Sequence, residues 1–297
     1  MKYTAAATHG VGHRHALDLE AYLRRIGYSG SLQPVPTVLE AIHLAHATHI
    51  PFENLDILLG RPIALDLASL QAKLVAGGRG GYCFEQNLLF SAMLQRLGFA
   101  VTHLAARVIY PSGRKLPRTH ILLRVDVAGA TWLADVGFGL EGLLLPVPFV
   151  GGREARQFGW TYRAVEANAE WTLQSLRNGA WTDLYAFSLE PQLAVDFEPA
   201  NHYTATHPDS RFVRTLTVQL PTPEVRYRLR NRELVLDRGG TVTRRELADD
   251  DELLSVLAEV FGLRFPAGTR FGYREDASRG ATYTGTSFNM TGGANES

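Results

Sequence analysis

The spacing of apolar residues changes from helical to strand-like near residue 98, and this change limits the possible folds more than any other feature. Before it, "ALDLEAYLRRIG" and "TVLEAIHLAHATH" place apolar residues three and four positions apart, which is typical of amphipathic helices. After it, "FAVTHLAARVIY", "THILLRVDV" and "TWLADVGFG" alternate with a period of two, and the turn-forming stretches "PSGRK" and "AGA" separate them. The sequence therefore predicts an α+β fold, in which helices come first and an antiparallel sheet follows.

Shorter alternating stretches extend the β-rich part to about residue 240, namely "FGWTYRAVE", "EWTLQSLR", "RTLTVQL", "EVRYRLR" and "RELVLDR". In "LADDDELLSVLAEVFG", acidic residues precede an apolar helical stripe and Gly262 ends it, which predicts one more helix. The polar, glycine-rich "TGGANES" predicts a frayed end. We therefore predict three packed units: residues 1–98 as a helical bundle, 99–205 as a β-domain, and 206–297 as an α/β segment with a flexible tail.

The composition argues against several classes of function. Thirty basic residues balance thirty acidic ones, so no net field attracts nucleic acid or an anionic membrane. The N-terminal "MKYTAAATHGVGHRH" lacks an apolar signal region, and no stretch approaches the roughly 18 apolar residues that a membrane helix needs. We expect a cytoplasmic monomer or homodimer whose partner is a small molecule, without nucleic acid or membrane among its partners.

Cys83 is the only cysteine of the 297 residues, which excludes an internal disulfide and a metal site made of several thiolates. It follows "GGRGGY", and the apolar residues of "CFEQNLLFSAMLQRLG" recur at helical spacing up to Gly98. Cys83 is therefore predicted in the first turn of a helix, where free amide hydrogens and the helix dipole favour a thiolate. Free cysteines are also among the most buried residues, so an inert core thiol is the alternative unless a histidine partners it.

His120 and Asp135 are the candidate partners of this cysteine. Alternation in "RTHILLRV" places His120 and Leu122 on one face of a strand. A two-residue loop at 128–129 would pair Leu122 with Asp135, and His120 would then be diagonal to that carboxylate and within reach of it. Asp135 would fix the tautomer of His120, which would in turn hold Cys83 as a nucleophile. Another loop length would break this register, and an aspartate that ends a strand is otherwise most often a cap or turn residue.

Two further motifs do not lead to a second site. In "GGRGG" the glycines lack the following Lys-Ser/Thr of a phosphate-binding loop and no clear strand precedes them, so we reject a nucleotide site. His43 and His46 lie one turn apart and could chelate a metal, but a third convergent ligand is not evident, and we expect no metal. Arg79 could neutralise buried charge or tie down the glycine loop, and the sequence leaves both roles open.

Taken together, the motifs resemble the arylamine N-acetyltransferase family. The similar stretches are "IPFENLD", "RGGYCFEQN", the "TH" of "RTHILL", "ADVGFG" and "HPDSRF", within a resemblance that extends from about residue 17 to residue 265. It implies a helical bundle, a β-barrel-like middle domain and an α/β lid around a cysteine-protease-like core, with a catalytic triad at Cys83, His120 and Asp135. It also implies ping-pong transfer of an acetyl group from acetyl-CoA, as co-substrate, to arylamines or arylhydrazines through an acetyl-cysteine.

The same resemblance implies roles for residues around the nucleophile. Phe52 would lie near the substrate pocket, Glu53 and Asn54 would form a supporting network, and Phe138 would line the pocket of the acceptor amine. The candidates for coenzyme A contact are Thr119, Gly139 and Phe212. For each of these residues taken singly, packing in the core is the alternative explanation.

Three other functions remain compatible with the pattern. The triad could serve a cysteine hydrolase or transglutaminase-like enzyme that acts on amide bonds, or an amide synthase of the resembling family that closes a ring on a bulky acyl substrate. A small-molecule-binding protein with an inert Cys83 is the non-enzymatic alternative. Acylation of Cys83 by CoA thioesters rather than peptides would exclude the hydrolase, and fast alkylation at mildly acidic pH would count against the inert thiol.

Overall fold

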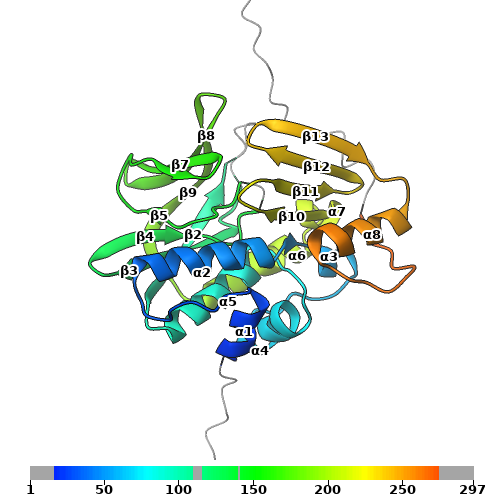
Figure 1. The fold of residues 1–297 in the computed structure, drawn as a ribbon, viewed down its shortest axis with the longest axis horizontal. Helices are drawn as coiled ribbons and strands as arrows, with labels where there is room; N and C mark the ends of the chain where they lie inside the picture. Colours follow the sequence, from blue (N-terminus) through cyan, green and yellow to red (C-terminus); the bar gives the residue numbers. More distant parts are fainter. Residues whose placement is uncertain (1–16, 110–115, 140, 274–297) are drawn as a thin grey trace, which may run out of the picture.

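The computed structural model describes residues 17–109, 116–139 and 141–273, which form a helical layer and two antiparallel sheets (Figure 1). The polar leader and the tail that the sequence predicts to fray lie outside these residues. None of the helices in the described part combines the length and the apolarity needed to cross a lipid bilayer. The arrangement confirms the α+β class.

Helices dominate the chain before residue 98, as the spacing of apolar residues predicts. The two long ones are α2 (Pro36–His49), which starts with proline in its first turn, and α5 (Cys83–Arg96). Gly98 follows α5 with a φ of 91°, a conformation that suits glycine and ends the helix. The shorter elements are α1 (Leu19–Arg25), α3 (Leu55–Leu58), α4 (Leu67–Leu70) and the π-helical turn η1 (Gln71–Ala76).

Among the described residues, an eight-stranded antiparallel sheet curls into a nearly closed barrel, with the strand order β5-β4-β3-β2-β9-β8-β7-β6. This sheet confirms the barrel-like middle part that the resemblance implies. Its strands are β2 (Ala100–Val108), β3 (His120–Val127), β4 (Ala130–Ala134), β5 (Val147–Pro148), β6 (Ala155–Gln157), β7 (Trp160–Ala167), β8 (Glu170–Arg177) and β9 (Ala180–Gln192).

The hairpin of β3 and β4 has the register that the sequence predicts. Leu123 pairs with Ala134, and the ladder closes where Val127 pairs with Ala130. The two loop residues at 128–129 have φ values of 50° and 75°, as in the type I′ turn that fits the twist of a two-residue hairpin. The position opposite Leu122 therefore falls on Asp135, just beyond the end of β4.

A second sheet brings distant parts of the chain together in the order β1-β10-β11-β12-β13. The strands predicted in "RTLTVQL", "EVRYRLR" and "RELVLDR" belong to this sheet, and α8 packs on one of its faces. Asp249 caps α8 and Gly262 ends it, as the sequence predicts. The elements are β1 (Phe52–Glu53), β10 (Thr217–Pro221), β11 (Arg226–Arg230), β12 (Glu233–Arg238), β13 (Thr241–Glu246) and α8 (Asp250–Phe261).

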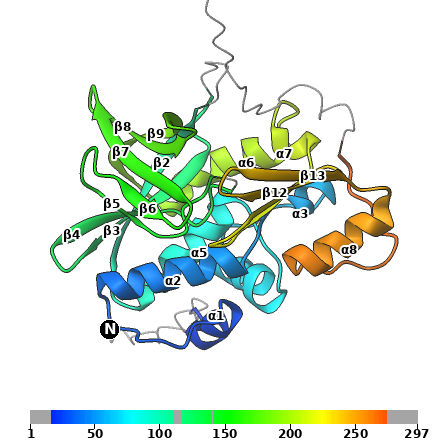
Figure 2. The ribbon, with the colours of Figure 1, turned by 45° about the horizontal axis from the view of Figure 1, so that its top comes forward.

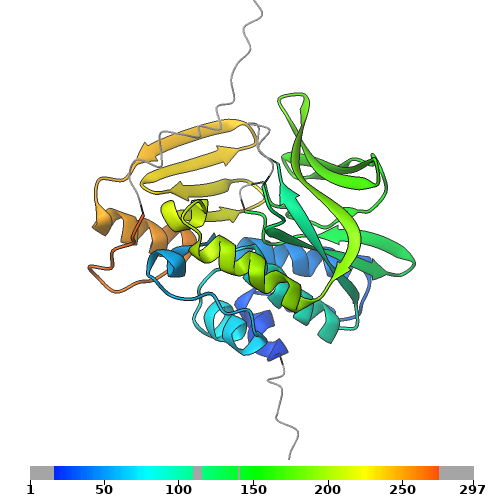
Figure 3. The ribbon, with the colours of Figure 1, turned by 180° about the vertical axis from the view of Figure 1, so that it is seen from behind.

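The two sheets stand side by side above the helical layer that contains α2 and α5 (Figures 1 and 2). The link between them comprises η2 (Ala194–Phe197), α6 (Glu198–Thr206) and α7 (Arg211–Arg214), and α6 crosses the back of the molecule (Figure 3, yellow-green). β1 belongs to the first predicted unit yet pairs with β10 of the third, so the units share a sheet. Their boundaries at residues 98 and 205 stay predictions.

Candidate active site

Cys83 is the first residue of α5, which is the position predicted from the sequence. Its side chain is 5% exposed, and its Sγ lies 3.6 Å from the carbonyl oxygen of Thr119. The helix start is fixed by Glu85, whose carboxylate accepts a hydrogen bond from the Tyr82 backbone N–H at 3.1 Å. The thiol therefore lies where the partial positive charge of the helix N-terminus is greatest.

His120 and Asp135 meet across the hairpin, as the predicted register requires. The Nε2 of His120 lies 2.7 Å from Oδ2 of Asp135, and the two side chains are 3% and 0% exposed. Because Nε2 is occupied by the carboxylate, Nδ1 is the nitrogen that remains for Cys83, which lies close enough to raise the pKa of His120. The structure thus brings together the three residues that the sequence singled out, in the order thiol, imidazole, carboxylate.

Charge favours the ionised forms of this pair. Burial alone would lower the pKa of His120, but the charge and hydrogen bond of Asp135, together with Cys83, raise that pKa to about 10. Burial opposes ionisation of Asp135 as well, yet the charge of His120 and the hydrogen bonds to the carboxylate hold its pKa below the ordinary value. An imidazolium beside Cys83 is therefore the stable state of His120 at neutral pH.

Asn87 connects the helix that carries Cys83 to the carboxylate of Asp135. It lies one turn after the cysteine on α5, so both side chains share a helix face. Its Nδ2 donates to Oδ1 of Asp135 at 2.9 Å and to the carbonyl of Ile121 at 2.8 Å, while its Oδ1 accepts from the backbone N–H of Val136. Asn87 was not predicted from the sequence, although an amide side chain one helical turn after the candidate nucleophile is a pattern that could have identified it.

His43 holds the same aspartate from α2. Its Nδ1 lies 3.0 Å from the carbonyl of Leu144, and its Nε2 lies 3.2 Å from the backbone nitrogen of Asp135. Since a carbonyl only accepts and an amide N–H only donates, Nδ1 carries the proton and the ring is neutral. Burial accordingly lowers the pKa of His43 to about 4. His43 thus holds the backbone of Asp135 in place instead of serving as a metal ligand.

His46 is also fully hydrogen-bonded, so the histidine pair offers no free metal ligand. Its Nδ1 contacts the hydroxyl of Tyr22 and its Nε2 lies 2.6 Å from Oε1 of Gln86. Burial lowers its pKa to about 3. Within the part of the chain that the structure describes, no group of three or more His, Cys, Asp or Glu side chains is placed to hold a metal ion.

Two aromatic rings enclose the imidazole of His120. Phe138 meets it edge-on at 5.1 Å between ring centroids, and Tyr185 lies 4.9 Å away. Burial, followed by the nearby charge of Asp135, raises the pKa of Tyr185 well above its ordinary value, so the phenol stays neutral. Phe138 was a predicted site residue, whereas Tyr185 was missed because its strand, β9, was missed.

Two glycines let the segment after Asp135 pass close to Cys83. A Cβ on Gly137 would lie 2.8 Å from the Cα of Cys83, which leaves no room for a side chain. Gly139 has a φ of 88°, and a Cβ there would collide with the Gln219 amide and lie 3.5 Å from the ring of Phe52. The segment therefore runs from the nucleophile to the second sheet.

The other predicted aromatic residues form a layer next to the helix start. The ring of Phe212 lies 5.9 Å from that of Phe52 and 5.8 Å from that of Tyr82, which precedes Cys83. Asn54 donates to the backbone carbonyls of Phe212 and Thr215, so it anchors the segment that carries this ring. Phe212 thus packs on Tyr82, the residue before Cys83, whereas the backbone carbonyl of Thr119 contacts the Cys83 thiol itself.

A buried network of ion pairs packs against the glycine loop at residues 77–81. Arg79 pairs with Glu53 at 2.7 Å and with Asp56 at 3.2 Å, and Lys73 pairs with Glu85 at 2.7 Å and with Asp56 at 3.0 Å. Because Glu85 also fixes the start of α5, the network ties the loop to the helix that carries the thiol. Arg79 therefore performs both roles that the sequence left open: it neutralises buried charge and holds the glycine loop.

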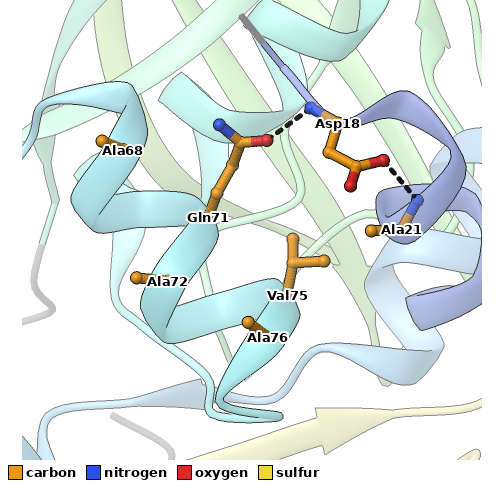
Figure 4. A pocket seen from close by; sticks show the side chains of 7 residues that line it. All are labelled: Asp18, Ala21, Ala68, Gln71, Ala72, Val75 and Ala76. Atoms are coloured by element: carbon orange, nitrogen blue, oxygen red, sulfur yellow. Dashed lines mark hydrogen bonds between the residues drawn. The ribbon is translucent and has the colours of Figure 1, made fainter. Parts of the chain in front are cut away.

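A hollow of about 280 Å³ lies elsewhere, between α1 and the α4–η1 helix (Figure 4). Its two polar members are engaged: Gln71 accepts from the backbone of Asp18, whose carboxylate accepts from the backbone of Ala21. The lining is Asp18, Ala21, Ala68, Gln71, Ala72, Val75 and Ala76. No residue that could act as a nucleophile lines it, and we assign it no part in the chemistry.

Comparisons with known proteins identify relatives in both sequence and fold. A family model described as N-acetyltransferase matches residues 37–269. The arylamine N-acetyltransferase of Mycolicibacterium smegmatis is 40% identical over 254 residues, which cover 84% of this chain and 92% of the relative. The solved structure of the M. tuberculosis arylamine N-acetyltransferase has a TM-score of 0.80 at 37% identity and covers 82% of this chain and 93% of its own. That of the Mycobacterium marinum enzyme in complex with CoA has a TM-score of 0.80 at 34% identity, with coverage of 82% and 92%.

Proposed function

Because the chain belongs to the arylamine N-acetyltransferase family, we propose that it moves an acetyl group from acetyl-CoA to the nitrogen of an arylamine or arylhydrazine through an acetylated Cys83. One observation carries this proposal: the buried pair of His120 and Asp135 lies beside Cys83, the first residue of a helix. An imidazolium beside a cysteine is the arrangement that keeps a sulfur nucleophilic near neutral pH.

In the first half-reaction, the Cys83 thiolate attacks the thioester carbonyl of acetyl-CoA. The bond between carbonyl carbon and CoA sulfur breaks as the bond to Cys83 forms, and the imidazolium of His120 gives its proton to the departing CoA thiolate. One thioester replaces another, so the step is nearly balanced in energy. Acceleration must come from the poised thiolate and from donors that stabilise the oxyanion, and the amides at the start of α5 are the donors we propose.

In the second half-reaction, the amine attacks the acetyl-cysteine. The neutral His120 takes a proton from the attacking nitrogen, the amide bond forms, and the thiolate of Cys83 leaves, which restores the ion pair. Asp135 and Asn87 exchange no proton in this scheme. Their role is to keep the ring of His120 oriented in both half-reactions. The imidazole of His120 thus donates a proton to the CoA sulfur in the first half-reaction and accepts a proton from the amine nitrogen in the second.

The acceptor class follows from the surroundings of His120. An arylamine is mostly neutral at physiological pH and can attack without prior deprotonation, whereas an alkyl amine arrives protonated. The ring of Phe138 beside His120 is a flat apolar group against which an aromatic acceptor can pack. We propose Phe138 as the main contact of the acceptor, with Phe52 near the same pocket. Thr119, Gly139 and Phe212 are the contacts that we propose for coenzyme A.

Steady-state kinetics test this function. Initial rates at several fixed acetyl-CoA concentrations should give parallel double-reciprocal lines, since CoA leaves before the amine binds. Across a panel of anilines, hydrazines and alkyl amines, turnover should be fastest with the first two classes. Intersecting lines would exclude the acetyl-cysteine route, and release of free acetate or cleavage of peptide amides without transfer would favour the hydrolase alternative.

A further inference from the structure

Three arginines alternate along β11 on the face of the second sheet that adjoins the barrel. Arg226 marks the direction of this face, because its guanidinium donates to the carbonyl of Gly142 at 3.0 Å and lies 4.3 Å from the centre of the Trp160 ring. Side chains two positions apart on a strand share a face. Arg228 and Arg230 therefore point from the second sheet toward the barrel as well.

Arg228 lies in a cross-strand row that starts at the candidate active site. Phe52 of β1 pairs with Gln219 of β10, which in turn pairs with Arg228 of β11. Neighbouring strands are about 4.8 Å apart, so Arg228 lies about 10 Å from Phe52 along the row. Gln219, the residue between them, is packed against Gly139.

The half-buried guanidinium of Arg228 contains one donor that the described residues leave unpaired. Its Nε is buried and has no hydrogen-bond partner among residues 17–109, 116–139 and 141–273. Burial lowers its pKa, and the charges of Arg244, Arg230 and Arg177 lower it further, while Glu233 opposes them. A buried donor without an acceptor is costly, and an anion would relieve both that cost and the repulsion.

The acids near this cluster are already used. Glu233 pairs with Arg244 at 3.2 Å, and the carboxylate of Glu141 accepts from Nε of Arg177 at 2.7 Å. The neighbourhood of Arg228 therefore keeps an excess of positive charge that the described residues do not balance. An anion from outside the chain is the partner that fits.

We infer that Arg228 binds a phosphate group of the CoA thioester while its acetyl group is presented to Cys83. This inference rests on the proposed function. The planar guanidinium fork matches two oxygens of a phosphate, and such charge-assisted pairs are the stronger class of hydrogen bond. The flexible pantetheine arm is long enough to join a thioester at the nucleophile to a phosphate two strands away. Coenzyme A carries phosphate at two places, a diphosphate and a 3′-phosphate, and the donors used in the test separate them.

The test compares Arg228→Gln with wild type on three donors: acetyl-CoA, acetyl-dephospho-CoA and S-acetylpantetheine. The KM for acetyl-CoA should rise at least tenfold in the variant, a loss of about 1.4 kcal/mol, while the kinetics with S-acetylpantetheine stay within twofold of wild type. A rise that persists with acetyl-dephospho-CoA assigns the contact to the diphosphate, and one that disappears assigns it to the 3′-phosphate. Calorimetry of CoA binding should show the same tenfold loss, with partial rescue by Arg228→Lys.

Arg245→Gln is the matched control. Arg245 belongs to the neighbouring hairpin and pairs with Leu234, so it points to the opposite face, where it contacts Glu252. Its loss should leave the KM for every donor unchanged. An unchanged KM for acetyl-CoA in Arg228→Gln, or an equal loss with S-acetylpantetheine, would overturn the inference while leaving the proposed function intact. If wild type accepted an acetyl group from none of the donors, the proposed function itself would fall.

Discussion

Asp135→Asn tests the role of the carboxylate most sharply, because the substitution keeps the shape of the side chain. Two donors, the Asn87 amide and the Gly137 backbone N–H, both lie 2.9 Å from Oδ1 of Asp135. The new amide must therefore keep its oxygen on that side and turn its NH₂ toward Nε2 of His120. The ring would then carry its only proton on Nδ1, facing Cys83, and could no longer accept one from the sulfur.

The size of the effect follows from the pKa of His120, which its surroundings raise from 6.5 to about 10. Each pKa unit corresponds to about 1.36 kcal/mol, so loss of the carboxylate costs the imidazolium on the order of 3–5 kcal/mol. If the ion pair with Cys83 is the reactive state, acylation should slow by about 10²–10⁴-fold. Binding of the donor should change little, since Asp135 is buried and lies behind the ring.

Stopped-flow acetylation by acetyl-CoA and alkylation by iodoacetamide at pH 6–7 would both report the reactivity of the sulfur. Asp126→Asn is the control, because Asp126 is a partly exposed carboxylate on the same hairpin that pairs with Arg124 at 3.1 Å. It should react at the wild-type rate. Acylation within tenfold of wild type in a folded Asp135→Asn protein would refute the argument that the carboxylate sets the tautomer and charge of His120.

Three further predictions concern packing and charge. Gly137→Ala places a Cβ 2.8 Å from the Cα of Cys83, so the protein should lose about 1–3 kcal/mol of stability and alkylation of Cys83 should slow. An unchanged Tm would show that the backbone around residue 137 can move to accommodate the methyl group. Arg79→Met leaves Glu53 buried without its partner and should cost about 3–5 kcal/mol in urea unfolding, whereas a loss below about 1 kcal/mol would mean that the ion pair is dispensable. The raised pKa of His120 adds folding stability that is fully present below about pH 6.5 and is lost as pH rises through about 10. The difference in free energy of unfolding between wild type and His120→Gln should therefore shrink over that pH range. A difference that stays constant would contradict the raised pKa.

The parts of the site that the sequence predicts are those that local rules determine. The start of α5 and the β3–β4 hairpin depend on residues within about one element of each other, and a two-residue loop leaves only one register that keeps the apolar face buried. That is why alternation and loop length together could place His120 near Asp135. The nearness of Cys83 to both could be inferred only from chemistry and from resemblance.

The missed residues depend on contacts between distant elements. β9 was not predicted because Leu184–Phe187 are all buried, which breaks the alternation of apolar and polar residues, and because a register shift interrupts its pairing with β8. Tyr185, which lies in this strand, was therefore not predicted either. β1 has two residues and exists because its partner, β10, supplies the ladder. His43 looked like an ordinary helix residue, since nothing in its neighbourhood reveals the backbone of Asp135 packed against it.

The central claim is that a single sulfur carries the acetyl group between donor and acceptor. Intact-mass spectrometry after mixing the protein with acetyl-CoA, without an amine, measures this directly. Wild type should gain the mass of one acetyl group, peptide mapping should place it on Cys83, and the adduct should disappear when an aniline is added. Absence of any adduct on wild type, or an equal adduct on Cys83→Ala, would contradict the account.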